Sequence, residues 1–334
     1  MKAIHIIRTR YICNFQRVLE AMEYPIEDFL KYARVPAPLL DDPNMVISIV
    51  SMGRFLDIAV RETGRHDLAF LAGDLPLDHY GHAGRKVLEA SNLFRAMQML
   101  SITGKSETSV SNFFLSHGDG HAWFCFGPLG GSAVQRQQIE LYRVRVILVL
   151  LQTALGTDWM PEVVRLRYTD PASVANNPLL ASLNIEFDAG LTGVALPLEA
   201  LATPMPPVPW DIQRNDMEGL PVDPLTVDSL TAFRRLLVSY LPFRPNVEMM
   251  ADVTGISRRT IQRFLQDNDL NFSALLDQVV FNQAVSWLSD SDMAITEIAY
   301  RLGYGDVAHF SRSFRRLTGL APSKYRQQLQ ASCR

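Results

Sequence analysis

Two short stretches in the last quarter of the chain carry rows of hydrogen-bond donors. The donors are Arg258, Arg259, Gln262 and Arg263 in the first stretch, and His309, Ser311, Arg312, Ser313, Arg315 and Arg316 in the second. A guanidinium can grip guanine bidentately, and Ser, Arg and Lys side chains can hold phosphates. Each row by itself is more typical of a solvated helix face. Their duplication at matching spacing reverses that preference and favours contact with DNA.

The second stretch lies in a pattern that predicts a helix, a tight turn and another helix over 295–317. An apolar stripe, made of Ile295, Ile298, Ala299 and Leu302, marks the first helix. Gly303 follows where a left-handed residue would end that helix, and Asp306 is a good N-cap for the next. The buried stripe of the second helix would be Phe310, Phe314 and Leu317.

The first stretch repeats this pattern 48 to 49 residues earlier, over 247–265. Gly255 would end its first helix and Ser257 would cap its second. Its inward residues would be Val247, Met250, Ala251, Ile261, Phe264 and Leu265, and an apolar helix with Phe281, Ala284, Val285 and Leu288 would connect the two copies. The sequence therefore predicts an all-α domain with two helix-turn-helix motifs.

Charge and proline content divide the 334 residues into two domains. Seven of the 19 prolines fall between 197 and 224, where neither a helix nor a central strand could persist. The net charge of -3 hides an asymmetry, because residues 226–334 hold 13 Lys and Arg against 10 Asp and Glu, a net of +3 that leaves -6 for residues 1–225. We expect one domain over 1–200, a Pro-rich linker over 201–225 and a second domain over 226–334.

The first 200 residues mix helical and strand patterns and predict an α+β domain. Helical spacing of apolar residues covers 45–62, 92–100 and 135–155. Strand-like pieces cover 109–115, 121–126, 163–168 and 193–196, and the first two flank HGDG, a hairpin-type connection. No apolar stretch has the ~20 residues that span a bilayer, and the charged N-terminus lacks a signal peptide, so we expect a cytoplasmic protein without a membrane partner.

Other chemistries find little support in the sequence. His79, His82, His117 and His121 could be drawn together as a metal cluster, but the glycines around Asp119 favour a hairpin turn there. Cys13, Cys125 and Cys333 form no CxxC pair, and no GxSxG, HExxH, P-loop or GxGxxG pattern occurs. We therefore expect no metal, no cofactor and no enzymatic activity.

The segment from 295 to 326 resembles the second helix-turn-helix of the AraC/XylS family of bacterial transcription regulators. The matching residues are Ile295, Ile298, Ala299, Leu302, Gly303, Tyr304, Phe310, Arg312, Phe314, Arg315, Gly319, Pro322, Tyr325 and Arg326. The first motif is similar to the family's looser pattern. This resemblance implies base contacts from Arg259, Gln262, Arg263, Val307, Ala308, His309 and Arg312 in double-stranded operator DNA. It implies phosphate contacts from Ser257, Arg258, Thr260, Ser311, Arg315, Arg316, Ser323 and Lys324.

Residues 1–225 are similar to the sensory region of regulators related to the ornithine-utilisation and virulence activators, often called arabinose-binding. The resemblance rests on PAPLLDDPN, TGRHDLAFLAG, HYGHAG and GLTGVALPLEAL. It implies a small-molecule effector or a homodimer partner for this domain, and activation through RNA polymerase. Candidate effector-binding residues are His79, His82, Arg85, Trp123, Phe126 and Arg143. The alternative is a helical partner-binding or structural protein without affinity for DNA.

Overall fold

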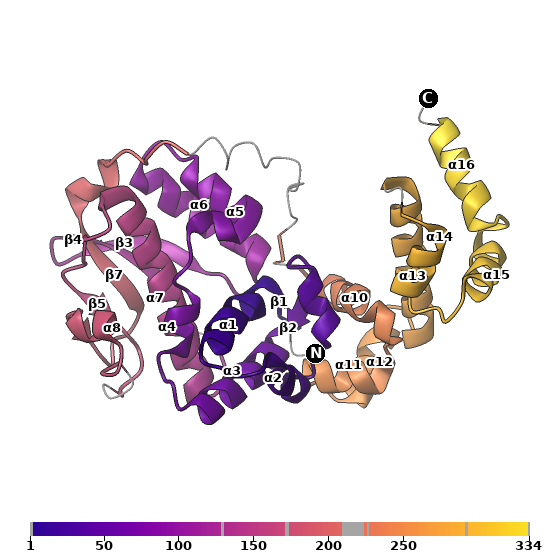
Figure 1. The fold of residues 1–334 in the computed structure, drawn as a ribbon, viewed down its shortest axis with the longest axis horizontal. Coiled ribbons are helices and arrows are strands. Elements are labelled where there is room, and N and C mark those ends of the chain that lie inside the picture. The colour runs from indigo at the N-terminus through magenta and orange to yellow at the C-terminus, as the bar shows by residue number, and fades with distance from the viewer. Residues whose placement is uncertain are drawn as a thin grey trace. The chain divides into compact units, whose positions relative to one another are not determined.

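The computed structural model describes residues 3–127, 130–170, 174–208, 224–225, 227–290 and 293–332. The chain divides into two units, which are shown in Figure 1. One unit comprises His5–Val227, and the other comprises Asp228–Arg334 together with Met1–Ile4. Residues 209–223 of the predicted Pro-rich linker lie outside the described part of the chain.

The first unit contains a five-stranded sheet with the strand order β3-β4-β7-β5-β6. Its strands are β3 Phe113–Gly118, β4 His121–Phe126, β5 Val164–Arg165, β6 Ile185–Glu186 and β7 Thr192–Pro197. β3 and β4 pair antiparallel across a turn in which Asp119 and Gly120 have positive φ angles of 55° and 79°. The predicted hairpin and the strand near 193–196 are confirmed, whereas the strand predicted over 163–168 is only two residues long.

Helices α6 Leu93–Glu107 and α7 Ala133–Leu155 share a hydrophobic core with this sheet. The core includes Phe124, Phe126, Val194 and Leu196 from the strands and Ala96, Met97, Leu141, Val144, Leu148 and Leu151 from the helices. A capping box starts α7, because Ser132 accepts from the backbone of Gln135 while the Gln135 side chain returns to Ser132. Both predicted helices are confirmed, and α6 continues about two turns beyond the predicted end at residue 100.

Further helices of this unit are α1 Arg10–Ala21, α2 Ile26–Ala33, α3 Ile49–Thr63, α4 Leu68–Ala72, α5 Gly81–Leu88 and α8 Pro178–Ser182. The helix predicted over 45–62 is wrong at its start, because Val46–Ser48 form β2, which pairs antiparallel with β1 Ile6–Arg8. Ser48 is extended and caps α3 by accepting from the backbone of Ser51. The strand predicted from Ser109 begins only at Phe113, because the Ser109 amide donates to Ile6 of β1 instead.

The second unit is helical throughout its described residues. Its α-helices are α10 Ser229–Tyr240, α11 Val247–Thr254, α12 Arg258–Gln266, α13 Phe272–Asp290, α14 Ile295–Arg301, α15 Val307–Thr318 and α16 Pro322–Ser332, and the 3-10 turn η6 Leu241–Phe243 follows α10. The pairs α11–α12 and α14–α15 are the two predicted helix-turn-helix motifs, and α13 connects them. The fold class is therefore as predicted, an α+β domain followed by an all-α domain. Within the described residues, no helix is long and apolar enough to cross a membrane.

Candidate nucleic-acid interface

The turn between α14 and α15 is fixed by its backbone. Gly303 has a φ of 82°, and its amide donates to Tyr300 while the next amide, of Tyr304, donates to Ala299. A Cβ added to Gly303 would overlap the carbonyl oxygen of Leu241, so the chain requires glycine here for close approach as well as for conformation. The carboxylate of Asp306 then caps α15 by accepting from the His309 amide at 2.6 Å.

An aromatic cluster packs against the buried face of α15. Phe310 and Phe314 are buried, and the Phe314 ring lies 6.1 Å from Phe281 of α13 and 5.3 Å from Tyr325 of α16. Tyr304 of the turn packs 5.3 Å from Phe310. The prediction that Leu317 is buried is wrong, since its side chain is 51% exposed. Phe281 and Tyr325 cover the face of α15 at Phe314, and the last turn of the helix extends beyond that cover.

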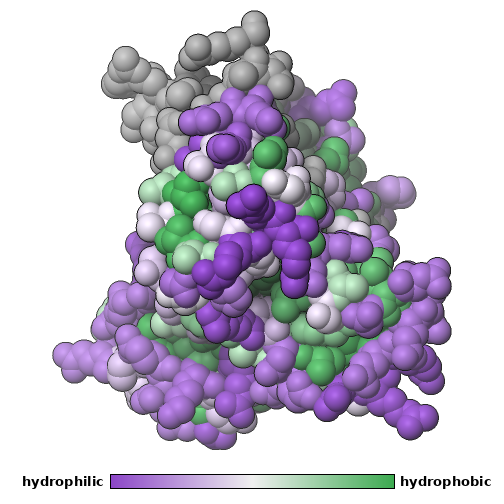
Figure 2. All heavy atoms as spheres, turned by 90° about the vertical axis from the view of Figure 1, so that its right-hand side faces the viewer, coloured by the Kyte–Doolittle hydropathy of each residue, from purple (hydrophilic) through white to green (hydrophobic). Residues whose placement is uncertain are grey.

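The opposite face of α15 exposes its basic side chains to solvent. Exposed residues on it are Ala308, His309, Arg312, Arg315 and Arg316, and Val307 and Ser311 are half-buried. Ser323 and Lys324 at the start of α16 are exposed as well. Among the described residues, no carboxylate forms an ion pair with Arg312, Arg315 or Arg316. Hydrophilic side chains also predominate on the face turned to the viewer in Figure 2, with hydrophobic ones in separate small patches.

The α11–α12 pair has the same plan with different packing. Gly255 ends α11 with a φ of 65°, and the Ser257 hydroxyl caps α12 by accepting from the Thr260 amide at 3.2 Å. The buried side chains are aliphatic, namely Met250, Val253, Ile256, Ile261 and Leu265. Phe264, which the sequence placed among the inward residues, is half-buried.

The outward face of α12 presents Arg258, Arg259, Gln262 and Arg263, all exposed, and half-buried Thr260. One of these cations already has a carboxylate partner, because the Arg258 guanidinium lies 2.6 Å from Glu248 of α11. The second helix of each pair, α12 or α15, thus carries several arginines on one face. The arginines of α15 are less neutralised by carboxylates than those of α12.

The candidate effector residues are scattered over the α+β unit. Trp123 and Phe126 lie on opposite faces of β4, as alternate faces of a packed strand, and Trp123 stacks under Arg165 at 4.0 Å. His79 is exposed beside Arg17, and His82 and Arg85 are half-buried on α5. The structure brings Phe126 and Arg143 together, with the guanidinium 5.1 Å from the ring.

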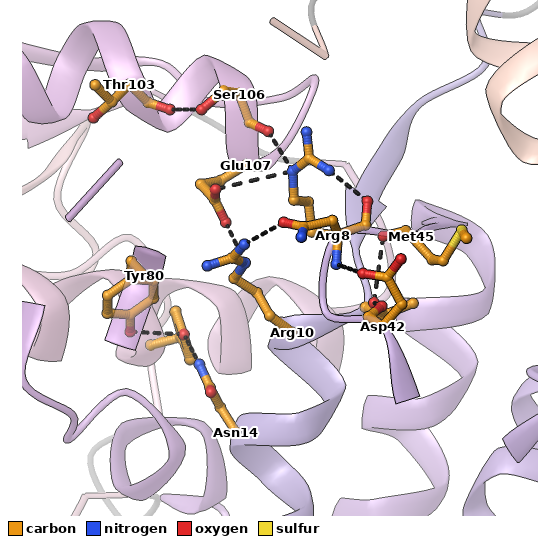
Figure 3. Close-up of polar contacts among 12 residues, drawn as sticks. Arg8, Arg10, Asn14, Asp42, Met45, Tyr80, Thr103, Ser106 and Glu107 are labelled. Carbon is orange, nitrogen blue, oxygen red and sulfur yellow. Dashed lines mark hydrogen bonds and ion pairs between the residues drawn. The ribbon is translucent and has the colours of Figure 1, made fainter. Parts of the chain in front are cut away.

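Sequence reasoning missed a group of buried charges in the same unit. Glu107 at the end of α6 faces Arg8 and Arg10, as Figure 3 shows, with its oxygens 3.9 Å and 3.1 Å from their Nε atoms. Burial raises the pKa of the Glu107 carboxyl, and the two guanidiniums act in the opposite direction. No sequence motif indicates these residues. Arg8 lies in β1, whose pairing with the distant β2 the sequence pattern does not predict, and Arg10 follows at the start of α1.

A helical unit with two helix-turn-helix pairs, joined to a separate α+β unit, defines a DNA-binding transcription regulator with a sensory domain. Comparison with known families supports this class. Residues 24–205 match the arabinose-binding domain of AraC transcription regulators, and residues 250–328 match a helix-turn-helix domain. The first match alone covers more than half of the chain, and the protein belongs to the AraC family of transcription regulators.

Among similar proteins is the ornithine utilization regulator of Pseudomonas aeruginosa, 28% identical over 310 residues, which are 88% of each chain. The transcriptional activator RhaS of an Enterobacter species is 34% identical over 117 residues, 35% of this chain and 41% of that protein. The solved structure of the regulator CdpR from Pseudomonas aeruginosa is 18% identical, with a TM-score of 0.45 over 95% of this chain and 98% of that one.

Proposed function

We propose that the protein binds operator DNA through both helix-turn-helix units, with α12 and α15 entering successive major-groove segments about one helical turn, ~34 Å, apart. The observation that carries this proposal is the second row of exposed arginines on α15, without an ion pair among the described residues. Because the two units differ in sequence, a single chain would read an asymmetric site. The base contacts in this proposal are those that the family resemblance implies: Arg259, Gln262, Arg263, Val307, Ala308, His309 and Arg312.

The phosphate contacts in this proposal are Ser257, Arg258, Thr260, Ser311, Arg315, Arg316, Ser323 and Lys324. Ser257 and Ser323 lie at the start of α12 and α16, where backbone amides and the helix dipole favour an anion. Val307 and Ala308 on the first turn of α15 offer apolar contact to a thymine methyl group. Direct reading would therefore fall to the first turns and the middle of each recognition helix.

Residues 1–200 act in this proposal as the sensory domain, residues 201–225 as linker and residues 226–334 as the DNA-binding domain. A small molecule or a second copy of the chain bound to the sensory domain shifts the population that is competent for DNA, by its differential affinity for the two states. The output would be activation through RNA polymerase, in the cytoplasm on nucleoid DNA. The activation is supported by the similar protein RhaS, which is named a transcriptional activator.

The test separates base reading from phosphate contact in the full-length chain. Arg312→Ala should lose about 1–3 kcal/mol of discrimination at one base position, with little change at the others. Lys324→Ala should weaken binding to all sequences alike and reduce the salt slope by about 1. Both are measured by gel shift on operator variants at several salt concentrations.

If neither variant changed operator binding in these ways, the assignment of base and phosphate contacts would be wrong. If the full-length chain showed no salt-dependent binding to any duplex, the helical unit would instead bind a protein partner. Arg95→Ala, which removes an exposed arginine of the α+β unit that donates to Gln98, serves as the charge-matched control and should leave DNA binding unchanged.

A further inference from the structure

The two helix-turn-helix pairs are joined at a second place besides α13. α13 connects the pairs along the chain (Figure 1). In addition, the turn η6, which precedes the first pair, lies against the turn of the second pair. We term this the η6–turn contact, and its residues are Leu241, Arg244, Gly303 and Gly305. Its hydrogen bond joins residues 59 positions apart, so only the folded unit creates it.

The closest approach in this contact is between backbone atoms. Leu241 is 1% exposed, and its carbonyl oxygen occupies the space that a Cβ at Gly303 would need. The same added Cβ would lie 3.2 Å from Cγ of Arg244. The Leu241 carbonyl also accepts from the Arg244 amide at 3.0 Å, which fixes the turn from which the Arg244 side chain departs. η6 and the second turn therefore fit together only with glycine at this position.

The Arg244 guanidinium makes the polar part of the contact. Its Nε–H donates to the Gly303 carbonyl, just beyond the end of α14. Carbonyls near the C-terminus of a helix lack intrahelical donors, and a cation there also interacts favourably with the helix dipole. The Nη2 atom lies 3.3 Å from the position of a Cβ at Gly305, the residue before the N-cap of α15. Arg244 thus spans the turn between α14 and α15.

On its other side, Arg244 is tied closely to the first pair. Its backbone is left-handed, with φ 51° and ψ 66°, and only Pro245 separates it from Asn246. Asn246 caps α11 by accepting from the Met249 amide at 2.8 Å. The proline ring fixes the φ of the intervening residue, so this connection has little conformational freedom. The position of the second turn is therefore linked through Arg244 to that of α11.

An exposed arginine in this unit has an alternative role, which is contact with a DNA phosphate. Arg244 is exposed and forms no ion pair with a carboxylate among the described residues. However, its Nε–H is already used by Gly303 and its stem packs against the second turn. The side chains of Arg312 and Arg315, by contrast, donate to no residue that the structure describes. The contacts of Arg244 therefore favour a role in holding the turn.

We propose that Arg244 is a positioning residue for DNA reading, which holds α15 in a fixed orientation relative to α12 through the η6–turn contact. A connection through α13 alone would allow the second pair to swing about one helix, and a contact outside α13 restrains that motion. The fixed orientation sets the spacing between the two DNA segments that one chain reads, and it reduces the freedom lost on binding. This inference rests on the proposed function and adds what determines that spacing.

The first experiment measures how binding depends on the distance between the two DNA segments. The probe is a duplex that the full-length parent selects from random-sequence DNA, together with a version that carries one extra base pair between the contacted segments. That base pair rotates one segment by roughly 34–36° about the duplex axis. The parent should lose roughly tenfold or more in affinity, whereas Arg244→Ala should lose about threefold or less, because a flexible connection lets both helices reach their segments. Arg244→Lys keeps a donor for the Gly303 carbonyl and should recover most of the parent's dependence on spacing.

Arg326→Ala is the matched control. Arg326 also donates to a backbone carbonyl, that of Met293 at 2.7 Å, but both residues flank the second pair. Its loss should lower Tm and leave the parent's dependence on spacing unchanged. A general loss of stability weakens the binding of every duplex alike, so only a positioning role changes the ratio between two spacings.

The second experiment measures the orientation of the two helices without DNA. Spin labels are attached at Gln266 of α12 and Leu317 of α15, which are both exposed, in a background in which the three native cysteines are replaced by alanine. Double electron–electron resonance should give one narrow distance distribution for the parent and for Arg244→Lys, and a broader one for Arg244→Ala. Equal widths would overturn the proposal.

Two further outcomes distinguish this proposal from others. If Arg244→Ala bound duplexes with a single segment more weakly than the parent and reduced the salt slope by about 1, Arg244 would be a phosphate contact and the positioning role would be wrong. If the parent itself ignored the extra base pair, the proposed reading of two segments would fail. The label distances alone would then decide whether Arg244 orients the two helices.

Discussion

The two helix-turn-helix units share one backbone plan but differ on the buried and the exposed faces of their second helices, α12 and α15. Below α15, Phe281, Phe310, Phe314 and Tyr325 form an aromatic cluster that joins α13, α15 and α16. Below α12, the buried side chains are aliphatic. Aromatic rings contribute large buried areas and preferred mutual geometries. The second unit is therefore built around one aromatic cluster, whereas the first depends on smaller aliphatic contacts.

The outward faces of the two second helices differ in how far their arginines are neutralised by carboxylates. The first unit pairs Arg258 with Glu248, and the arginines of α15 meet no carboxylate among the described residues. In the proposed complex, cations that no described carboxylate neutralises are available for base contacts, and side chains that are already positioned lose little freedom when they bind. A partly neutralised helix suits a weaker, more adaptable contact. The two units are then expected to respond unequally to equivalent substitutions.

The largest expected effect is in the aromatic cluster. Phe314→Ala should lower the free energy of unfolding of the helical unit by about 3–5 kcal/mol, because it removes a ring that is 2% exposed and in contact with two other helices. Leu265→Ala, in the first unit, should cost about 2–4 kcal/mol and leave the Phe314 cluster intact. Urea unfolding of the full-length chain measures both. A larger loss from Leu265→Ala would reverse the ranking of the two units.

Next in size is the close approach at Gly303. Gly303→Ala should cost about 2 kcal/mol or more, because the new methyl group meets the Leu241 carbonyl and the φ is positive. Gly319→Ala is the control, since it has a similar φ of 77° but open space around the added methyl group. It should cost only about 1 kcal/mol. Equal losses would show that the contact between η6 and the second turn does not matter.

The sequence predicted the helical unit better than the α+β unit for identifiable reasons. Gly255, Ser257, Gly303 and Asp306 act locally, within one turn of the helices that they end or begin, so their roles could be inferred from spacing alone. The hairpin at Asp119 and Gly120 is local too. The prediction that Leu317 is buried was wrong because helical spacing shows which face of α15 the residue lies on, but not how far the neighbouring helices extend along that face.

The failures in the α+β unit all depend on distant pairings. β1 and β2 are three residues long, and their partners lie about 40 positions apart, so neither shows an alternating pattern of its own. Val46 to Ser48 therefore looked like the start of the helix that follows. The buried charges of Arg8, Arg10 and Glu107 were missed for the same reason, since they come from elements that only the fold brings together.

The helix caps provide a smaller test, in which the two units should behave alike. Asp306→Ala and Ser257→Ala should each cost about 1 kcal/mol, because each removes the side-chain acceptor for a backbone amide of the first turn. Asp306→Asn keeps an acceptor and should cost a few tenths of a kcal/mol. Urea unfolding measures all three. A loss confined to one unit would mean that the two turns differ in more than their cores.

The smallest effect tests the difference in surface charge. Glu248→Gln frees Arg258 from its partner at 2.6 Å and removes one negative charge, so affinity for any duplex should rise roughly two- to fivefold at low salt. Glu297→Gln removes the same charge from α14, where its partner is Arg301 rather than an arginine of α15. If the first unit is restrained by its own ion pair, Glu248→Gln should also steepen the salt slope by about 1, and Glu297→Gln should not. Fluorescence anisotropy on a nonspecific duplex at several salt concentrations measures both slopes. Equal slopes would mean that net charge alone sets the affinity and that the Arg258–Glu248 pair does not distinguish the two units.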